Sequence, residues 1–236
     1  MPSIRSTAES CLGVTGGTIS VRGDVFGYVW GPMDRTLSVK SHLNLIKDTA
    51  FNLSVILVAH DPGFAGAFTS AETISMQTAV DVMREIYAQV GLGVRKIYWQ
   101  YIPTADANGY SVVNASEATQ LTEDWSGDND GIDVFFVTTV SDAGGWSKTN
   151  GSCDKDVQGQ RTGAVLEVAG SDQFLGVLLA HEVGHYLGLS HGNDITNVMG
   201  ADTNMNGIGE INQNSTGLTD TQGDTMKGHC SIRPSC

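Results

Sequence analysis

The segment HEVGHYLGLSH, residues 181–191, constrains this chain most, because it holds three of the chain's six histidines. His181 and His185 are four residues apart, and the preceding QFLGVLLA has the apolar content of a buried helix. On a helix, residues four apart lie on one face, with Cβ atoms about 5–6 Å from each other. We therefore expect the two imidazoles to project side by side.

Gly188 suits the left-handed residue that ends such a helix, after which the chain turns back and brings His191 to the same point. Three neutral imidazoles, with bonds of about 2.0–2.1 Å, are a typical ligand set of a catalytic zinc ion and leave a fourth position for water. Glu182 is placed to take a proton from that water without being a ligand. The sequence thus predicts a zinc site with a general base.

This spacing resembles H-E-x-x-H-x-x-G-x-x-H, the motif of the metzincin zinc endopeptidases. ITNVMG adds Met199, eight residues after His191, where that family has its Met-turn. The resemblance implies hydrolysis of peptide bonds, with an extended peptide or protein substrate bound along an edge strand. The candidate edge strand is Gly145, Trp146, Ser147, Lys148 and Thr149, for which a loop is an equal alternative.

The subfamily stays open. GGWSKT resembles the edge region of pappalysin-like enzymes, whereas DPGF and the short final helix resemble matrixins. Astacins and serralysins have a tyrosine two residues after the Met-turn methionine, where this chain has Ala201. A tyrosine ligand is therefore not expected.

Apolar runs with turn signals predict strands, which are 53–60, 94–102, 132–140, 144–149 and 163–169. Capping boxes start helices at Thr69 with Glu72 and at Thr219 with Gln222, and Ser171 or Asp172 caps the motif helix. The expected fold is α/β, of the α+β zincin type. It has a mixed, mostly parallel five-stranded sheet, a backing helix and the active-site helix.

Three regions are expected along the chain. Residues 1–50 have no clear role and fit either a hairpin or the remnant of a pro-segment. Residues 51–191 form an N-terminal catalytic subdomain with the zinc-binding helix. Residues 192–236 form a small, irregular C-terminal subdomain with the Met-turn and the final helix.

The net charge of −13 argues against nucleic acid and anionic membrane surfaces as partners, and no apolar run is long enough for membrane insertion. We expect a monomer. Four cysteines without a CxxC spacing favour disulfides and a secreted protein, with three pairings open among Cys11, Cys153, Cys230 and Cys236. The first residues, MPSIRSTAESCLG, lack the apolar core of a secretion signal. SCLGV faintly resembles the inhibitory cysteine of matrixin pro-segments, but the disulfide role is favoured for Cys11.

Calcium is a second candidate cation. DTNMNG begins like a calcium loop, with Asp202, Asn204, Asn206 and Glu210 as oxygen donors, but Gln213 stands where a bidentate carboxylate is needed. A plain Asn/Gly turn fits equally well. GDNDGID, residues 127–133, is a weaker candidate of the same kind.

Two other functions remain open. One is a zinc hydrolase of a non-protein amide, such as a cell-wall cross-link, because nothing in the motif excludes it. The other is a non-catalytic binding module that retains the zinc site, against which the intact Glu182 counts.

Overall fold

The computed structural model describes residues 49–61, 67–107, 109–141, 143–202 and 209–234. The predicted features Cys11, Cys236, Asn204 and Asn206 lie outside these residues, as does all but the end of the 1–50 segment. The structure therefore bears on the predicted catalytic subdomain and on most of the predicted C-terminal subdomain.

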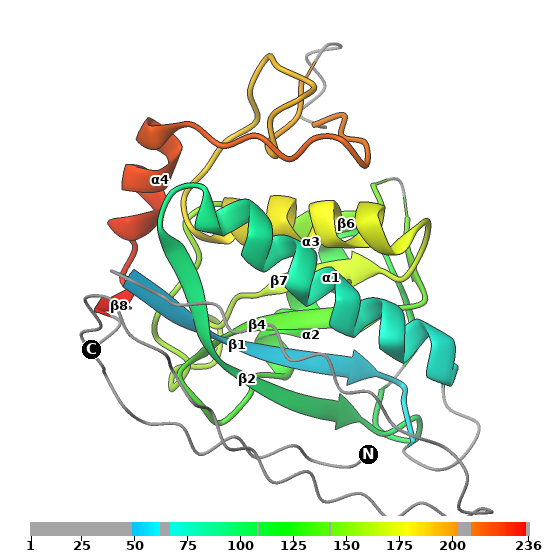
Figure 1. Ribbon diagram of the computed structural model, residues 1–236. Helices are drawn as coiled ribbons and strands as arrows, with labels where there is room; N and C mark the ends of the chain where they lie inside the picture. The colour runs from blue at the N-terminus through cyan, green and yellow to red at the C-terminus, as the bar shows by residue number, and fades with distance from the viewer. Residues whose placement is uncertain (1–48, 62–66, 108, 142, 203–208, 235–236) are drawn as a thin grey trace, which may run out of the picture. The chain divides into compact units, whose positions relative to one another are not determined.

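A mixed, mostly parallel sheet is the centre of the fold (Figure 1). Its strands are β1 (Thr49–Val58), β2 (Leu92–Ile102), β4 (Gly131–Val137), β6 (Gly145–Ser147), β7 (Ala164–Glu167) and β8 (Arg233–Pro234). The order is β2-β1-β4-β7-β6, with β8 beside the start of β1. β6 is antiparallel to β7 and β8 to β1, while the other pairs are parallel. The five predicted strands form the main path, and only β8 was not expected.

The central strands are almost fully buried, as expected for parallel strands covered on both faces. All seven residues of β4 and every residue of β1 after Thr49 are buried. β6 ends at Ser147, so Lys148 and Thr149 of the predicted edge strand lie beyond it.

The predicted strand 132–140 is interrupted at Thr138. The N–H groups of Thr138 and Thr139 both donate to the carbonyl of Ser111, which turns the chain away from the main sheet. β5 (Thr139–Val140) then pairs with β3 (Val112–Val113) in a separate two-stranded sheet. The apolar run alone does not show this break.

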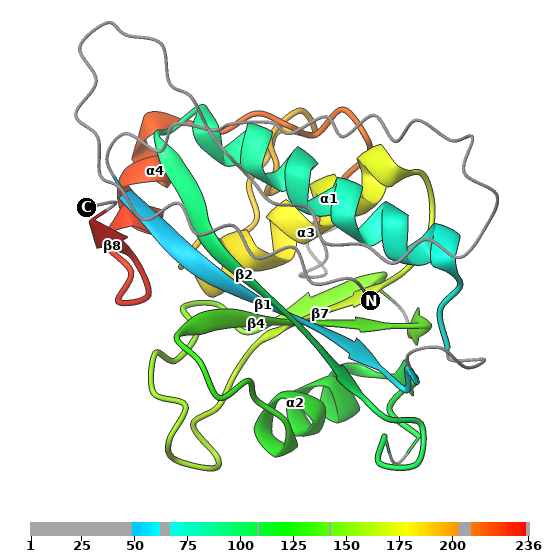
Figure 2. The same ribbon diagram turned by 60° about the horizontal axis from the view of Figure 1, so that its bottom comes forward.

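Helices cover both faces of the sheet (Figure 2). α1 (Ser70–Ala88) and α3 (Asp172–Tyr186) share a core with one face, and α2 (Ala115–Asp124) packs on the other. α4 (Asp220–Lys227) is the predicted final helix. The helix α2 was not predicted, although Asn114 and Glu117 form its capping box. No helix among the described residues is long and apolar enough to cross a bilayer.

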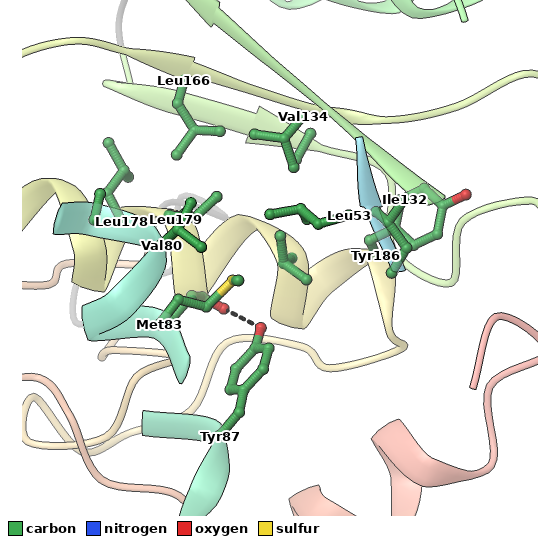
Figure 3. Packing of buried hydrophobic residues seen from close by; sticks show 14 of the residues in the cluster. Leu53, Val80, Met83, Tyr87, Ile132, Val134, Leu166, Leu178, Leu179 and Tyr186 are labelled. Atoms are coloured by element: carbon green, nitrogen blue, oxygen red, sulfur yellow. Dashed lines mark hydrogen bonds between the residues drawn. The ribbon is translucent and has the colours of Figure 1, made fainter. Parts of the chain in front are cut away.

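The helix α3 is buried along its length rather than on one face only. Every residue from Leu175 to Tyr186 is buried. Figure 3 shows α1 side chains packed against it, with the Tyr87 hydroxyl donating to the Ala180 carbonyl at 2.7 Å. The histidine segment therefore sits on a helix fixed from several sides.

A disulfide joins Cys153 to Cys230, so one of the predicted cysteine pairs forms. The loop before Cys153 also covers the end of α3. The N–H of Asn150 donates to the His185 carbonyl at 2.9 Å, and that of Gly151 to the Tyr186 carbonyl at 2.8 Å. These bonds satisfy carbonyls that a helix end leaves without intrahelical partners. The disulfide thus ties the cap of α3 to the chain just after α4.

Replacing both cysteines, Cys153→Ser with Cys230→Ser, is expected to lower the free energy of unfolding by about 2–4 kcal/mol, because the bond closes a long loop in the unfolded chain. Thermal unfolding followed by circular dichroism should show a midpoint several degrees lower. An unchanged midpoint would mean that this bond adds nothing to stability.

Candidate metal centre

The three predicted histidines converge on one point. Nε2 of His185 lies 3.1 Å from Nε2 of His181 and 2.9 Å from Nε2 of His191, and the third pair is 3.3 Å apart. Zinc–nitrogen bonds of about 2.0–2.1 Å in a tetrahedral arrangement place the nitrogens roughly 3.3 Å apart. The spacing of the three rings fits one such ion.

The turn that brings His191 to this point has the predicted left-handed glycine. Gly188 has φ +98°, and the N–H groups of Gly188 and Leu189 donate to the carbonyls of His185 and Gly184, each at 2.9 Å. These two bonds close the end of the helix in the manner of a Schellman motif. His191, three residues after Gly188, thereby lies beside His185.

Backbone carbonyls fix the orientation of two of the rings. Nδ1 of His181 lies 2.8 Å from the Val198 carbonyl, and Nδ1 of His185 lies 2.8 Å from the Leu189 carbonyl. A carbonyl only accepts, so each Nδ1 carries the hydrogen and each Nε2 presents its lone pair. Facing lone pairs about 3 Å apart repel unless a cation lies between them. The donor set therefore fits a metal ion better than it fits hydrogen bonds between the rings.

The surroundings keep these imidazoles neutral. Burial lowers the pKa of His181 to about 3, with further lowering from the neighbouring His185. Burial likewise lowers the pKa of His185 to about 4, against the opposing effect of the bond to Leu189. Neutral imidazole is the form that binds a metal.

Met199 lies beneath the motif helix, fully buried. A methyl group added at Gly184 would lie 2.8 Å from the sulfur of Met199, so the glycine allows the two segments to approach closely. The preceding residue, Val198, supplies the carbonyl that orients His181. The segment predicted as a Met-turn thus packs against the motif helix and orients the ring of His181.

Glu182 lies against the edge strand β6. A methyl group added at Gly145 would lie 2.8 Å from the carboxyl carbon of Glu182. The carboxyl group is buried, and burial raises its pKa to about 8, whereas a cation at the nearby histidines would act in the opposite direction. The structure brings together the predicted base, the three predicted ligands and the first residue of the predicted edge strand.

Comparison with protein families identifies a metallopeptidase family. The family described as metallo-peptidase family M12B, reprolysin-like, matches residues 71–192, more than half of the 236 residues. The chain belongs to this family. It is a reprolysin-like metallopeptidase, and the matched region ends one residue after His191. Neither the matrixin-like nor the pappalysin-like subfamily considered above is confirmed by this match.

Solved structures that resemble this reprolysin-like chain include three whose alignments each cover 75% of it. They are metalloproteinase-II from Bacteroides fragilis (14% identity, TM-score 0.48, 52% of that chain), archaemetzincin from Methanopyrus kandleri (14%, 0.47, 94%) and mirolysin in complex with a compound (13%, 0.46, 91%). The chain spans about half the length of metalloproteinase-II. No curated protein sequence matches the chain.

The predicted calcium loop finds no support. Asp202 and Glu210 are described, and neither joins a group of metal-binding side chains within the described part of the chain. The flanking residues Ala201 and Glu210 instead exchange two backbone hydrogen bonds, at 3.0 and 3.1 Å. Gly209 lies against the ring of His191, where a methyl group would come within 2.7 Å of Nε2. Gly209 therefore packs beside the metal centre, a contact that the sequence did not reveal.

In the second candidate calcium segment, residues 127–133, Asp130 and Asp133 bond to other side chains of the protein. Asp133 is buried and bonds to Lys155 at 2.8 Å and to Ser126 at 2.7 Å. Asp130 accepts from Asn52 at 2.7 Å. These side chains stabilise the start of β4, so the structure does not support a calcium site there.

His229 lies near both sulfurs of the Cys153–Cys230 disulfide. Because these sulfurs are bonded to each other, they are not free as thiolate ligands. Nε2 of His229 hydrogen-bonds to the Gly151 carbonyl at 2.9 Å. His229 is buried and therefore has a structural role beside the disulfide.

The variant Gly145→Ala is expected to displace the carboxylate of Glu182 while leaving the three histidines in place. Displacement of a catalytic group by about 1 Å can cost about 100-fold in rate, so kcat/KM for a peptide should fall by about that factor with zinc content unchanged. Ser147→Ala, at the other end of β6, is the control. Wild-type turnover by Gly145→Ala would show that β6 does not set the position of the base.

Proposed function

We propose that this metallopeptidase is a zinc-dependent endopeptidase in which His181, His185 and His191 hold the ion and Glu182 is the general base. The observation that carries the proposal is the convergence of the three Nε2 atoms within 3.3 Å of one another. The buried carboxyl group of Glu182 lies on the same helix as His181 and His185. The tautomers set by the Val198 and Leu189 carbonyls support it further.

Each part of the site has a role in the proposed reaction. Zinc held by the histidines would supply a Lewis acid that polarises a carbonyl and lowers the pKa of water. Glu182 takes the proton from the attacking water and passes it to the leaving amine. Burial raises the pKa of this carboxyl group to about 8, which makes it a stronger base, and a cation at the histidines would favour the ionised form that accepts the proton.

β6 is the proposed binding strand for substrate. It is the last strand of the sheet order, and an extended peptide can add a further strand along Gly145–Ser147. Because Gly145 touches Glu182, a peptide bound there has its backbone beside the base. Binding through the backbone needs no free terminus, which supports an endopeptidase.

The disulfide supports secretion as the cellular setting, because such bonds persist in oxidising compartments. The proposed site joins the predicted subdomains 51–191 and 192–236, since His191 ends the first and Met199 belongs to the second. We propose a monomer as the working form, and calcium is not part of the proposal.

Glu182→Gln is expected to keep one zinc per chain and to lose at least about 100-fold in kcat, the usual contribution of a general base. Zinc content by elemental analysis and cleavage of a peptide library measure the two properties separately. Glu85→Gln, an exposed carboxylate on α1, is the matched control. Comparable turnover by both variants would remove Glu182 from the mechanism.

Removing zinc with a chelator is expected to abolish peptide cleavage, and adding zinc back should restore it. A chelator selective for calcium should leave cleavage unchanged, since the described residues support no calcium site. Cleavage that persists in zinc-free protein would contradict the proposal. Zinc binding with hydrolysis of non-protein amides alone, or with no hydrolysis, would favour the two other functions considered from the sequence.

A further inference from the structure

The turn beneath the histidines is joined to the start of α4 by two side-chain amides, those of Asn197 and Gln222. Nδ2 of Asn197 donates to Oε1 of Gln222 at 2.8 Å, and Nε2 of Gln222 donates to Oδ1 of Asn197 at 2.9 Å. Both bonds are partly buried and join residues 25 positions apart. Two reciprocal bonds between planar groups fix both their separation and their orientation.

Further hydrogen bonds to the two amide oxygens determine which way each amide is oriented. Oδ1 of Asn197 also accepts from the Met199 N–H at 2.9 Å. Oε1 of Gln222 also accepts from the Thr219 N–H at 2.9 Å and from the Thr219 hydroxyl at 3.2 Å. Turning either amide over would place an NH2 group against an N–H donor. The network therefore has one consistent arrangement.

The choice of glutamine at this position is informative. The capping boxes of α1 and α2 have a glutamate at the third helical position, Glu72 and Glu117, whereas α4 has Gln222. Glutamate and glutamine both accept from an N-cap N–H, but only glutamine has hydrogens to donate. In α4 that donor reaches Oδ1 of Asn197, a contact that helix capping does not require.

The amide pair is connected through the turn to one of the proposed zinc ligands, His181. Asn197 holds the turn through its side-chain bond to the Met199 N–H and through its carbonyl, which accepts from the Gly200 N–H at 2.8 Å. Within this turn, the Val198 carbonyl accepts from Nδ1 of His181. The partner of His185, by contrast, is the Leu189 carbonyl at the end of the motif helix itself. Of these two carbonyl partners, the one of His181 lies in the segment that the amide pair anchors.

We propose that Asn197 and Gln222 are positioning residues for the metal centre: by locking the turn to α4, they hold the Val198 carbonyl where it orients His181. This inference rests on the proposed zinc site. It assigns to α4 a role in metal affinity in addition to its role in packing.

The variant Gln222→Glu separates capping from positioning. It keeps the acceptor for Thr219, as glutamate does in α1 and α2, but it sets a carboxylate oxygen against Oδ1 of Asn197. Loss of a partner that orients a metal ligand typically lowers metal affinity about 10–100-fold, and we expect roughly tenfold for this more distant contact. The added negative charge alone would strengthen cation binding, so a loss must come from the broken hydrogen bond.

Zinc affinity of the full chain is measured by competition with a chromophoric chelator, and thermal stability is measured in excess chelator. Glu72→Gln makes the reverse exchange in the capping box of α1, where Glu72 accepts from the N–H and the hydroxyl of Thr69, and its zinc affinity should equal that of the wild type. Tenfold weaker zinc binding by Gln222→Glu at an unfolding midpoint near that of the wild type supports the inference. Zinc affinity within twofold of the wild type overturns it.

If Gln222→Glu unfolds, the truncations Gln222→Ala and Glu72→Ala replace it and its control. Both remove a capping side chain, so both lower stability, but only the first is expected to weaken zinc binding beyond the loss of stability. Equal zinc affinity of the two truncated chains overturns the inference. A wild-type chain that binds no zinc instead overturns the proposed function, which keeps the two failures distinct.

Discussion

Lone pairs of buried imidazoles that face one another are the constraint on which the site depends. The Val198 and Leu189 carbonyls place the hydrogens of His181 and His185 on Nδ1, so both Nε2 atoms point to one centre. Burial disfavours protonation, the other way to relieve the repulsion. A metal ion between the Nε2 atoms removes the repulsion while both imidazoles stay neutral. The elements around α3 can be understood as holding the rings in an arrangement that would otherwise be unfavourable.

The same packing joins the metal centre to the edge of the sheet. α3 carries His181, Glu182 and His185 within five residues, and its burial between α1 and the sheet fixes their direction. The missing side chain at Gly145 lets β6 approach Glu182 closely. Because one short strand both touches Glu182 and ends the sheet, the proposed binding of an extended peptide and the proposed proton transfer would take place at the same edge.

The sequence predicted the parts of this site that depend on local spacing. The four-residue interval of His181 and His185, the left-handed Gly188 and the capping boxes of α1 and α4 each involve a few neighbouring residues. The helix α2 was missed although its capping box offered the same signal.

Contacts between distant segments could not be predicted, because they depend on tertiary packing. The pairing of Cys153 with Cys230 spans 77 positions, and nothing local marks Gln222 as the partner of Asn197. The position of Gly209 against His191 likewise follows from a turn whose path the Asn- and Gly-rich sequence leaves undetermined.

X-ray absorption at the zinc edge of the loaded full-length protein tests the central claim most directly. Coordination by imidazole and oxygen alone, with zinc–nitrogen distances of about 2.0–2.1 Å, is the result that the three converging histidines predict. Sulfur scattering at about 2.3 Å would place the ion at cysteines instead and would contradict the account.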